Sequence, residues 1–390
     1  MPFRDRSMRL TPACASDYRE FARRRLPRQL FDYIDGGSYA ETTMRSNIED
    51  LASVKLRQRV LRDVSHIQLG TQVLGDDLAI PMVLGPVGLA GMFAKRAEVQ
   101  AARAAERCGV SFCESTVSIC GIDEVRAATT RPFWFQLYVI RDRGYAEHLM
   151  HRAYDAGSPV LVLTADLSVV GARYRDTRNG LTDPIWPPKH VFRGIDLGRH
   201  VRWVMNVGLG GHPLVFGNLE EVVPGAHTPN AFRDWVDSQF DPSVTWADLD
   251  WVRDHWPGKL VIKGILDPDD AVQAVAHGVD GIIVSNHGGR QLDATPSTIS
   301  ALPGIVEAVG DKTDVLVDGG IRSGLDVVKA LALGAKACLV GRPWAWAVAA
   351  RGEAGVAHML DVIKAEMQVA MSLTGVTDVA DLDRGVLLNS

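Results

Sequence analysis

The chain has 390 residues, of which 46% are hydrophobic and 23% charged, and its formal net charge at pH 7 is −5. This composition is that of an ordinary globular protein with enough apolar material for a large core, and it excludes a long disordered tail. The negative charge argues against a nucleic-acid partner, because such proteins present basic surface to the phosphates.

The amino-terminal region reads as helices that precede the main fold. The segment from Met1 to Ala15 contains arginines but lacks the apolar stretch of a secretory signal. A group of arginines follows on a predicted amphipathic helix, and we interpret it as a solvated face: Arg23, Arg24, Arg25 and Arg28. Another helix is expected to end in the run Phe31 to Gly37.

From residue 80 onward, short runs rich in β-branched residues alternate with Ala-rich or amphipathic stretches such as 96–108, 269–277 and 324–333. Such alternation closes into a parallel barrel, so we predict an α/β fold, a (β/α)8 TIM barrel with an N-terminal helical extension. We expect a single domain over 1–390, with the barrel at about 80–350 and a C-terminal helix at about 352–373. The predicted strands are 80–85, 110–114, 133–138, 160–166, 259–264, 281–285, 314–319 and 337–341.

A long insertion, about 175–245, separates the fourth predicted strand from the helix that starts at Trp246. Connections of that length are commonly functional. Its centre, about 190–215, is apolar and aromatic, with basic residues around it. Trp and Arg suit both a membrane surface and a subunit contact, so both interpretations stay open. The residues concerned are Trp203, Val204, Met205, Val207 and Leu209, with His190, Arg193, Arg199, His200 and Arg202 beside them.

The cysteine pattern indicates a reducing compartment. The chain has five cysteines, which form no CxxC pair and mostly fall in apolar runs. We therefore expect reduced, structural thiols and a cytoplasmic protein. No window reaches the roughly 18 to 20 uncharged apolar residues of a spanning helix, so any membrane contact is expected to be peripheral, on the inner face of the cell membrane.

The run Ser285 to Asp293 contains the most informative residues of the chain. It follows an apolar strand, and TIM barrels keep their chemistry at the carboxyl ends of their strands. Two glycines between His287 and Arg290 allow a tight turn, so a proton acceptor and a carboxylate-binding guanidinium point into one pocket. This arrangement suggests a 2-hydroxy acid substrate. The alternative is a strand-end turn whose His and Arg only cap neighbouring helices.

Two further strand ends carry charged groups. Asp166 would lie across the barrel mouth from His287, where a carboxylate orients an imidazole and stabilises its protonated form. Lys263 would lie deep in the barrel and needs an anionic partner. That partner is either the edge of a reduced flavin or an internal carboxylate, Asp166 or Asp318. We expect no metal site, because no third convergent ligand stands at a suitable spacing.

Two glycine-rich turns predict a phosphate cradle. The run from Asp318 through Gly319, Gly320 and Arg322 opens a helix at Gly324, and Gly341-Arg342 follows the last strand. Backbone N–H groups at a helix start hold a dianion, and TIM barrels place this site after strands seven and eight. No GxGxxG run follows a strand, so NAD is not implied.

These motifs resemble the FMN-dependent 2-hydroxy acid oxidase and dehydrogenase family over nearly the whole chain. Within that family they most resemble the bacterial quinone-linked L-lactate dehydrogenases, by Gly171 to Asp176, Val261 to Pro268 and Ala370 to Gly375, and next the mandelate dehydrogenases. The motifs that carry the resemblance are Asp32-Tyr33 before Gly36-Gly37, Trp134 to Tyr138, Leu163 to Asp166, Lys263-Gly264, Ser285 to Asp293, and Asp318 to Arg322.

The resemblance implies a role for each matching residue. His287 would be the base with Asp166 as its partner, Tyr138 would hydrogen-bond the reacting oxygen, and Arg290, Arg173 and Tyr33 would bind the substrate carboxylate. Lys263 would support the flavin N1–O2 edge. The other implied FMN contacts are Pro86, Val87, Gly88, Ser115, Gln136, Thr164 and Ser285 at the ring or ribityl chain, and Asp318, Gly319, Gly320, Arg322, Gly341 and Arg342 at the phosphate.

The expected reaction is oxidation of an L-2-hydroxy acid, first of all L-lactate to pyruvate, with FMN as cofactor. Quinone or a cytochrome is the expected acceptor, with oxygen left open, and the family's usual assembly implies a homotetramer. An aryl substrate such as (S)-mandelate is the alternative: Gly88 favours it, whereas the branched Val117 leaves less room for a ring. A non-catalytic flavin- or phosphate-binding barrel would require His287, Asp166 and Arg290 to be accidental.

Overall fold

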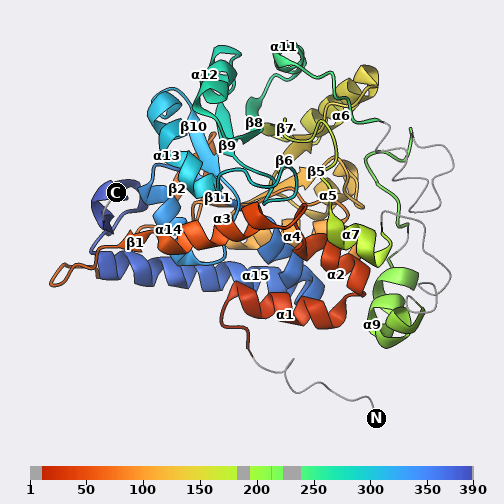
Figure 1. Cartoon of the computed structure of the whole chain (residues 1–390), viewed down its shortest axis with the longest axis horizontal. Helices are drawn as coiled ribbons and strands as arrows, with labels where there is room; N and C mark the ends of the chain where they lie inside the picture. The colour runs from red at the N-terminus through yellow and green to blue at the C-terminus, as the bar shows by residue number, and fades with distance from the viewer. Residues whose placement is uncertain (1–10, 182–193, 212, 223–238, 389–390) are drawn as a thin grey trace.

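The computed structural model describes residues 11–181, 194–211, 213–222 and 239–388. Eight parallel strands close into a barrel in the order β4 to β11, with β11 pairing back to β4 (Figure 1). The predicted TIM barrel is confirmed. Each predicted strand overlaps one of these eight, and β5 and β8 extend one residue beyond the predicted ends, to Ser115 and Ile265. Their bounds are β4 Met82–Leu84, β5 Ser111–Ser115, β6 Trp134–Leu137, β7 Val160–Thr164, β8 Lys259–Ile265, β9 Gly281–Val284, β10 Asp314–Val317 and β11 Ala337–Val340.

A short hairpin closes the amino-terminal end of the barrel. It consists of β2 (Thr71–Val73) and β3 (Asp76–Leu78), which pair antiparallel. Its Val73 and Leu74 belong to the same apolar cluster as inward-facing strand residues such as Trp134. The Leu74 N–H donates to Asp314 at the start of β10. Because this end is filled, a ligand reaches the barrel only at the carboxyl ends of the strands.

Helices cover the outside of the barrel, as the apolar spacing of their sequences requires. Side-chain caps define several of their starts: Asp142, Ser297 and Ser323 each accept a hydrogen bond from a backbone N–H of the first turn. The helices are α4 Ala97–Cys108, α5 Ile122–Ala128, α6 Arg143–Asp155, α11 Trp246–His255, α12 Pro268–Ala276, α13 Thr298–Val309, α14 Gly324–Ala332 and α15 Arg342–Thr374.

The last helix, α15, begins directly after β11 and is broken at Gly352, whose φ of 65° is non-helical. The segment 352–373, where a C-terminal helix was expected, is its second half. A side chain at Gly352 would meet Gln100 Oε1 at 2.5 Å, so glycine allows α15 to pack closely on α4. The chain then ends in η4 Val379–Asp381, η5 Arg384–Val386 and the strand β12 Leu387–Leu388, which pairs with β1 Lys55–Leu56.

The N-terminal extension forms three helices, of which the first two contact α15 and the third contacts α13 and α14 (Figure 1). The second helix ends beside the carboxyl ends of the barrel strands, where Ser38 donates to the Gly289 carbonyl at 2.9 Å. This contact brings Tyr33 and the two glycines after it to the barrel mouth. The helices are α1 Ala15–Arg25, α2 Arg28–Asp35 and α3 Thr42–Ser53, and a short turn η2, Ala90–Met92, follows β4.

The described parts of the insertion contain α7 (Tyr174–Asn179), α9 (Val201–Trp203) and the π-helical segment η3 (Val204–Leu209). The side chains on these last two segments divide between two faces. Val201, Met205 and Leu209 are exposed to 57%, 60% and 65%. The prediction that Val207 offers apolar surface is wrong, because Val207 is buried. Trp203 is partly buried, and its Nε1–H donates to the Met92 carbonyl at 2.8 Å.

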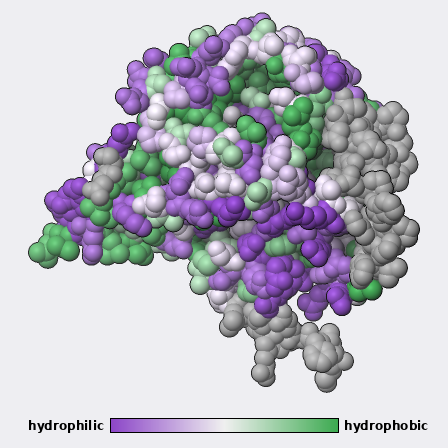
Figure 2. All heavy atoms as spheres, in the orientation of Figure 1, coloured by the Kyte–Doolittle hydropathy of each residue, from purple (hydrophilic) through white to green (hydrophobic). Residues whose placement is uncertain are grey.

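Surface features bear on the localisation and metal predictions. Within the described residues, no helix combines the length and the apolar character needed to cross a bilayer, and no group of three or more His, Cys, Asp or Glu is arranged to hold a metal. All five cysteines are described, and each is a free thiol. A separate surface feature is the loop that projects beyond β1: Figure 2 shows apolar side chains at its tip, where Val60 and Leu61 are exposed.

Candidate active site

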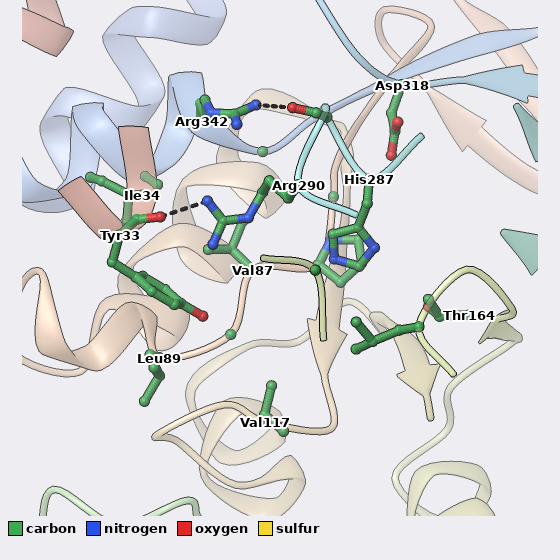
Figure 3. Close-up of a pocket in the computed structure, with 18 of the residues that line it drawn as sticks. Tyr33, Ile34, Val87, Leu89, Val117, Thr164, His287, Arg290, Asp318 and Arg342 are labelled. Carbon is green, nitrogen blue, oxygen red and sulfur yellow. Dashed lines mark hydrogen bonds between the residues drawn. The ribbon is translucent and has the colours of Figure 1, made fainter. Parts of the chain in front are cut away.

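A cavity of about 370 Å³ lies at the carboxyl ends of the strands (Figure 3). It is closed on one side by α2 and on another by the later part of the insertion, residues 214–216 and 240, which we call its returning end. The structure brings most of the predicted site residues into its wall. These are Tyr33, Pro86, Val87, Gly88, Tyr138, Thr164, Arg173, Lys263, His287, Arg290, Asp318, Gly319, Gly320, Arg322, Gly341 and Arg342.

Four predicted site residues lie behind that wall. Asp166 contacts the cavity through His287. Ser285 Oγ accepts from Lys263 at 2.8 Å and from the His287 N–H at 3.0 Å. Ser115 Oγ donates to Gln136 Oε1 at 2.9 Å, and both of these residues are buried. Asp166 and Ser285 therefore orient groups that line the cavity, whereas the side-chain amide nitrogen of Gln136 has no protein partner among the described residues and is left for a ligand.

His287 and Asp166 form a hydrogen-bonded pair, with Nδ1 and Oδ1 2.9 Å apart. His287 adopts a left-handed conformation, φ 58°, in the turn after β9. Close approach of Asp166 depends on Gly264, since a Cβ there would lie 2.6 Å from the Asp166 Cβ. Because Nδ1 is used by Asp166, Nε2 is the ring nitrogen left for a substrate. The predicted catalytic pairing therefore exists in the structure.

The electrostatics of this pair suit a base that is neutral at rest. Burial lowers the pKa of His287 below its ordinary value, and Asp166 opposes that shift without cancelling it. Burial alone would raise the pKa of the Asp166 carboxyl, but His287 and Lys263 hold it below its ordinary value. Asp166 thus stays ionised while His287 is free to accept a proton, and the imidazolium that forms is stabilised by the carboxylate.

Two guanidinium groups and an aromatic ring form a carboxylate-binding corner. The carbon of the Arg290 guanidinium lies 4.9 Å from the centre of the Tyr33 ring, and that of Arg173 lies 5.8 Å from it. Burial, together with Arg173, lowers the pKa of Arg290 to about 9. Two cations this close in a cavity favour an anionic ligand between them. Tyr138 completes this side, and burial raises the pKa of its phenol, which therefore acts as a hydrogen-bond donor.

The partner of Lys263 in the protein is Asp318. Their Nζ and Oδ2 atoms are 3.1 Å apart, so of the two carboxylates considered, the ion pair forms with Asp318 rather than Asp166. Both residues also line the cavity. Asp318 Oδ1 is buried without a partner in the described chain, so it can still accept a hydrogen bond from a ligand.

Unpaired buried polar atoms indicate where a cofactor fits. Among the described residues, Gln136 Nε2, Thr164 Oγ1 and Arg342 Nε have no protein partner, in addition to Asp318 Oδ1. Each such atom costs about 1–3 kcal/mol if left unsatisfied. They comprise donors suited to the carbonyl edge of a flavin, an acceptor suited to a ribityl hydroxyl, and a donor suited to a phosphate. The residues present therefore fit FMN.

The glycine turns after β10 and β11 form the phosphate end of the cavity. Gly320 has a φ of 86°, and a Cβ there would lie 2.1 Å from the Asn47 carbonyl, so only glycine fits. The prediction that the helix starting at Gly324 helps to bind the phosphate is wrong. Glu366 accepts a hydrogen bond from the first N–H of this helix, and the Ser323 side chain accepts one from the third. The helix N-terminus at the cavity is instead that of α15, which begins at Arg342.

The insertion supplies wall residues that sequence reasoning missed. Leu214, Val215, Phe216 and Phe240 line the cavity, and Phe240 packs edge-on against Tyr138 at 5.3 Å between ring centres. Nothing in their local sequence signals this role. Asp176 is also in the wall and buried, where burial raises its pKa against the influence of Arg290 and Arg173.

Asn218 anchors this returning end of the insertion to the barrel. Its amide donates to Glu114 and to the Ser115 carbonyl, and its Oδ1 accepts from the Ile122 N–H at 2.8 Å. A Cβ at the preceding Gly217 would lie 2.4 Å from the Gly121 nitrogen, so the two backbones are in direct contact. Contacts across this much sequence separation could not be predicted from spacing.

Residues 22–389 match the family described as FMN-dependent dehydrogenase. The chain belongs to that family. FMN is therefore its cofactor, which agrees with the unpaired polar atoms around the cavity. The predicted family resemblance and the predicted enzyme class are confirmed.

Individual relatives agree with this assignment. The chain is 55% identical over 372 residues to an L-lactate dehydrogenase of Caulobacter vibrioides, covering 95% of this chain and 96% of that protein. It is 51% identical over 376 residues to an L-lactate dehydrogenase of Pseudomonas syringae, with 96% and 98% covered. Among solved structures, the monotopic membrane protein (S)-mandelate dehydrogenase superimposes with a TM-score of 0.91 at 36% identity, covering 98% of this chain and all of that one.

Proposed function

We propose that this protein oxidises L-lactate to pyruvate and passes the electrons to a membrane quinone. The observation that carries the proposal is the placement of the His287–Asp166 pair in the same cavity as Arg290, Arg173 and Tyr33. This arrangement holds a carboxylate at one point and removes a proton at a neighbouring one. Relatives at 50–55% identity that are named L-lactate dehydrogenase support the choice of acid.

The residues of the cavity divide the reaction between them. Arg290 and Arg173 bind the substrate carboxylate, while Tyr138 donates a hydrogen bond to the oxygen on C2. His287 takes one proton at Nε2, either from the hydroxyl as the C2 hydrogen leaves as hydride, or from C2 itself. Bound FMN supplies the acceptor for the two electrons that lactate loses. A base held this way contributes about 10²- to 10⁴-fold to the rate.

An apolar wall favours a small aliphatic side chain on the substrate. Val117 occupies the space beside Gly88, where an added Cβ would lie 2.6 Å from Val117 Cγ2. Phe216 and Phe240 also line the cavity. The second candidate substrate is (S)-mandelate, because the solved structures that resemble this chain include mandelate dehydrogenases and a mandelate oxidase. A non-catalytic barrel would leave the coincidence of His287 and Asp166 unexplained.

A basic and apolar surface supports peripheral attachment to the inner face of the cell membrane. The exposed residues Val201, Met205 and Leu209 project from the insertion, with Arg202 beside them. Arg28 lies close to the start of this part of the insertion, since its N–H donates to Asp196 at 2.8 Å. Such a surface binds anionic lipid moderately and in a salt-sensitive way. Arg193 and His190, also considered for this contact, lie outside the described residues.

Electron transfer to quinone gives such attachment a purpose, because quinone is confined to the bilayer. The structural neighbour described as a monotopic membrane protein has the same fold. A cytochrome acceptor remains the alternative. We also propose a homotetramer, which size-exclusion chromatography coupled to light scattering would test.

Three measurements test the proposal. Denaturing the purified protein should release FMN; release of FAD, or a colourless protein that FMN cannot reconstitute, would refute the cofactor site. Steady-state rates with lactate and mandelate, each with a quinone analogue, ferricyanide and oxygen, should be highest for lactate with quinone. A higher kcat/KM for mandelate would reverse the substrate assignment.

The third measurement is flotation with anionic liposomes at low and high salt. Wild-type protein should float at low salt, and Met205→Ser with Leu209→Ser should remain in the soluble fraction. If wild type does not float and the double variant changes oligomer size instead, this surface is a subunit contact.

A further inference from the structure

One backbone carbonyl connects Arg290, which the proposed function assigns to the substrate carboxylate, with Arg342, which is predicted to contact the FMN phosphate. The Gly36 carbonyl oxygen accepts from Arg290 Nη1 at 2.9 Å and from Arg342 Nη2 at 2.7 Å. Arg290 faces the carboxylate corner, whereas Arg342 lies at the phosphate end of the cavity. Figure 3 shows both guanidinium groups beside the end of α2.

The end of α2 is suited to hold cations. The last carbonyls of a helix lack intrahelical partners and carry partial negative charge. Arg290 Nη1 also donates to the Tyr33 carbonyl at 2.6 Å, and Arg342 Nη1 donates to the Gly288 carbonyl at 2.8 Å. The direction in which each guanidinium presents its remaining N–H groups therefore depends on where this helix end and Gly36 are placed.

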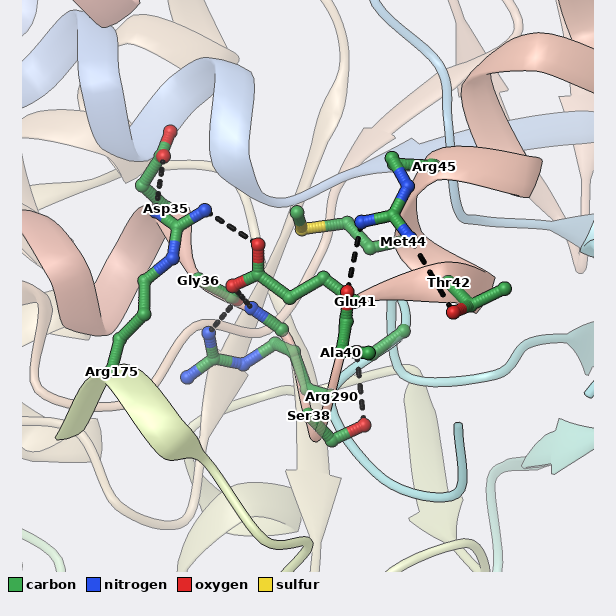
Figure 4. A network of polar contacts seen from close by, with 12 residues as sticks. Asp35, Gly36, Ser38, Ala40, Glu41, Thr42, Met44, Arg45, Arg175 and Arg290 are labelled. Atoms are coloured by element: carbon green, nitrogen blue, oxygen red, sulfur yellow. Dashed lines mark hydrogen bonds and ion pairs between the residues drawn. The ribbon is translucent and has the colours of Figure 1, made fainter. Parts of the chain in front are cut away.

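Arg175 fixes that placement from outside the cavity (Figure 4). Its Nη1 donates to Asp35 at 3.0 Å and its Nη2 to Glu41 at 2.6 Å, so it spans the bend that contains Gly36. Glu41 in turn accepts from the Gly37 N–H at 3.0 Å. Arg19 contributes a second cation to Asp35.

The bend is tightly packed as well as paired. A Cβ at Gly36 would lie 2.6 Å from the Asp32 carbonyl and 3.2 Å from Arg175 Cδ, and one at Gly37 would lie 2.7 Å from the Gly289 carbonyl. Burial acts to raise the pKa of Asp35, but Arg19 and Arg175 hold it below the ordinary value. Asp35 is 3% exposed, so its charge requires these partners.

We propose that Arg175 is a positioning residue that holds the Asp35–Glu41 bend, so that the Gly36 carbonyl orients Arg290 and Arg342 together. Arg175 touches neither substrate nor cofactor in this role. It couples the binding of the hydroxy acid carboxylate to the binding of the FMN phosphate. The inference rests on the proposed function, which assigns the carboxylate to Arg290, and on the predicted phosphate contact of Arg342, whose buried Nε has no partner among the described residues.

The test compares holoenzyme variants. In Arg175→Met, which keeps length but loses both hydrogen bonds, KM for lactate and the dissociation constant of FMN should each rise about 10-fold or more, since each lost bond is charge-assisted. Arg175→Lys should recover part of both effects. The matched control is Arg23→Met on α1, whose partner Glu20 is exposed, and it should change neither constant.

A double variant separates positioning from general loss of structure. If Arg175 acts through Arg290, then Arg175→Met in an Arg290→Lys background should raise KM by much less than it does alone; fully multiplicative effects would overturn the inference. Should Arg175→Met not fold, Glu41→Gln, which weakens one contact, replaces it with the same expected direction.

The two proposals fail in different ways. A raised KM in Arg290→Lys beside normal KM and FMN affinity in Arg175→Met would refute the positioning role alone. An unchanged KM in Arg290→Lys would refute the carboxylate assignment and the inference with it.

Discussion

The pairing of Asp166 with His287 predicts the direction in which the pH profile moves when the carboxylate is removed. As pH falls through the pKa of His287, the base becomes protonated and kcat/KM declines. Asp166 raises that pKa, although burial keeps the net shift downward. In Asp166→Asn the raising contribution is lost, so the acid limb of the profile should move to lower pH while the plateau rate falls.

The size of both effects follows from the geometry. The Nδ1–Oδ1 distance of 2.9 Å describes a buried, charge-assisted hydrogen bond, and such bonds contribute about 1.5–3 kcal/mol. Because one pKa unit corresponds to about 1.4 kcal/mol, the limb should move by about 1 to 2 units. The same loss of imidazolium stabilisation should slow the plateau by about 10- to 150-fold.

Anaerobic flavin reduction by lactate, followed by stopped-flow absorbance between about pH 4 and 8, measures both quantities. The control is Asp76→Asn, which removes a carboxylate at the opposite end of the barrel, where it accepts from Ser111 and Trp134. That variant should leave the limb in place. A limb that moves to higher pH in Asp166→Asn, or an unchanged plateau, would show that Asp166 does not act on His287.

Four further variants test the remaining assignments. His287→Gln should bind FMN normally yet reduce it at least 100-fold more slowly, and near-normal anaerobic reduction would remove His287 from the role of base. Arg290→Lys, which loses the planar fork, should lower kcat/KM for lactate more than 10-fold with FMN retained; equal kcat/KM would place the carboxylate elsewhere. Gly88→Ala should destabilise the protein by about 1–3 kcal/mol in a urea titration, because its Cβ would overlap Val117; the added change Val117→Ala should recover most of that loss, and no recovery would refute the steric explanation. Asn218→Ala should raise KM for lactate more than the FMN dissociation constant, since it releases the pocket-lining end of the insertion; the reverse order would contradict this reading.

The amino-acid sequence by itself determined the barrel and the main chemical groups of its site. The strands are short, β-branched apolar runs, and a run of that kind is stable only when buried between helices, so its pattern is local and readable. Parallel barrel strands end on one face, and this rule alone places His287, Asp166 and Lys263 in one region. These three residues could be assigned to the ends of the strands from the sequence alone, without knowledge of how the side chains pack.

The tertiary structure alone decided which partner each group meets. Trp203 turns inward because a carbonyl of Met92, more than a hundred positions earlier in the chain, accepts its N–H. The start of α14 is not available to a phosphate because Glu366 on α15 occupies it. The Gly36 carbonyl joins Arg290 and Arg342 only after three distant segments have folded together. Hydrogen bonds between such segments depend on three-dimensional placement, which local periodicity does not encode.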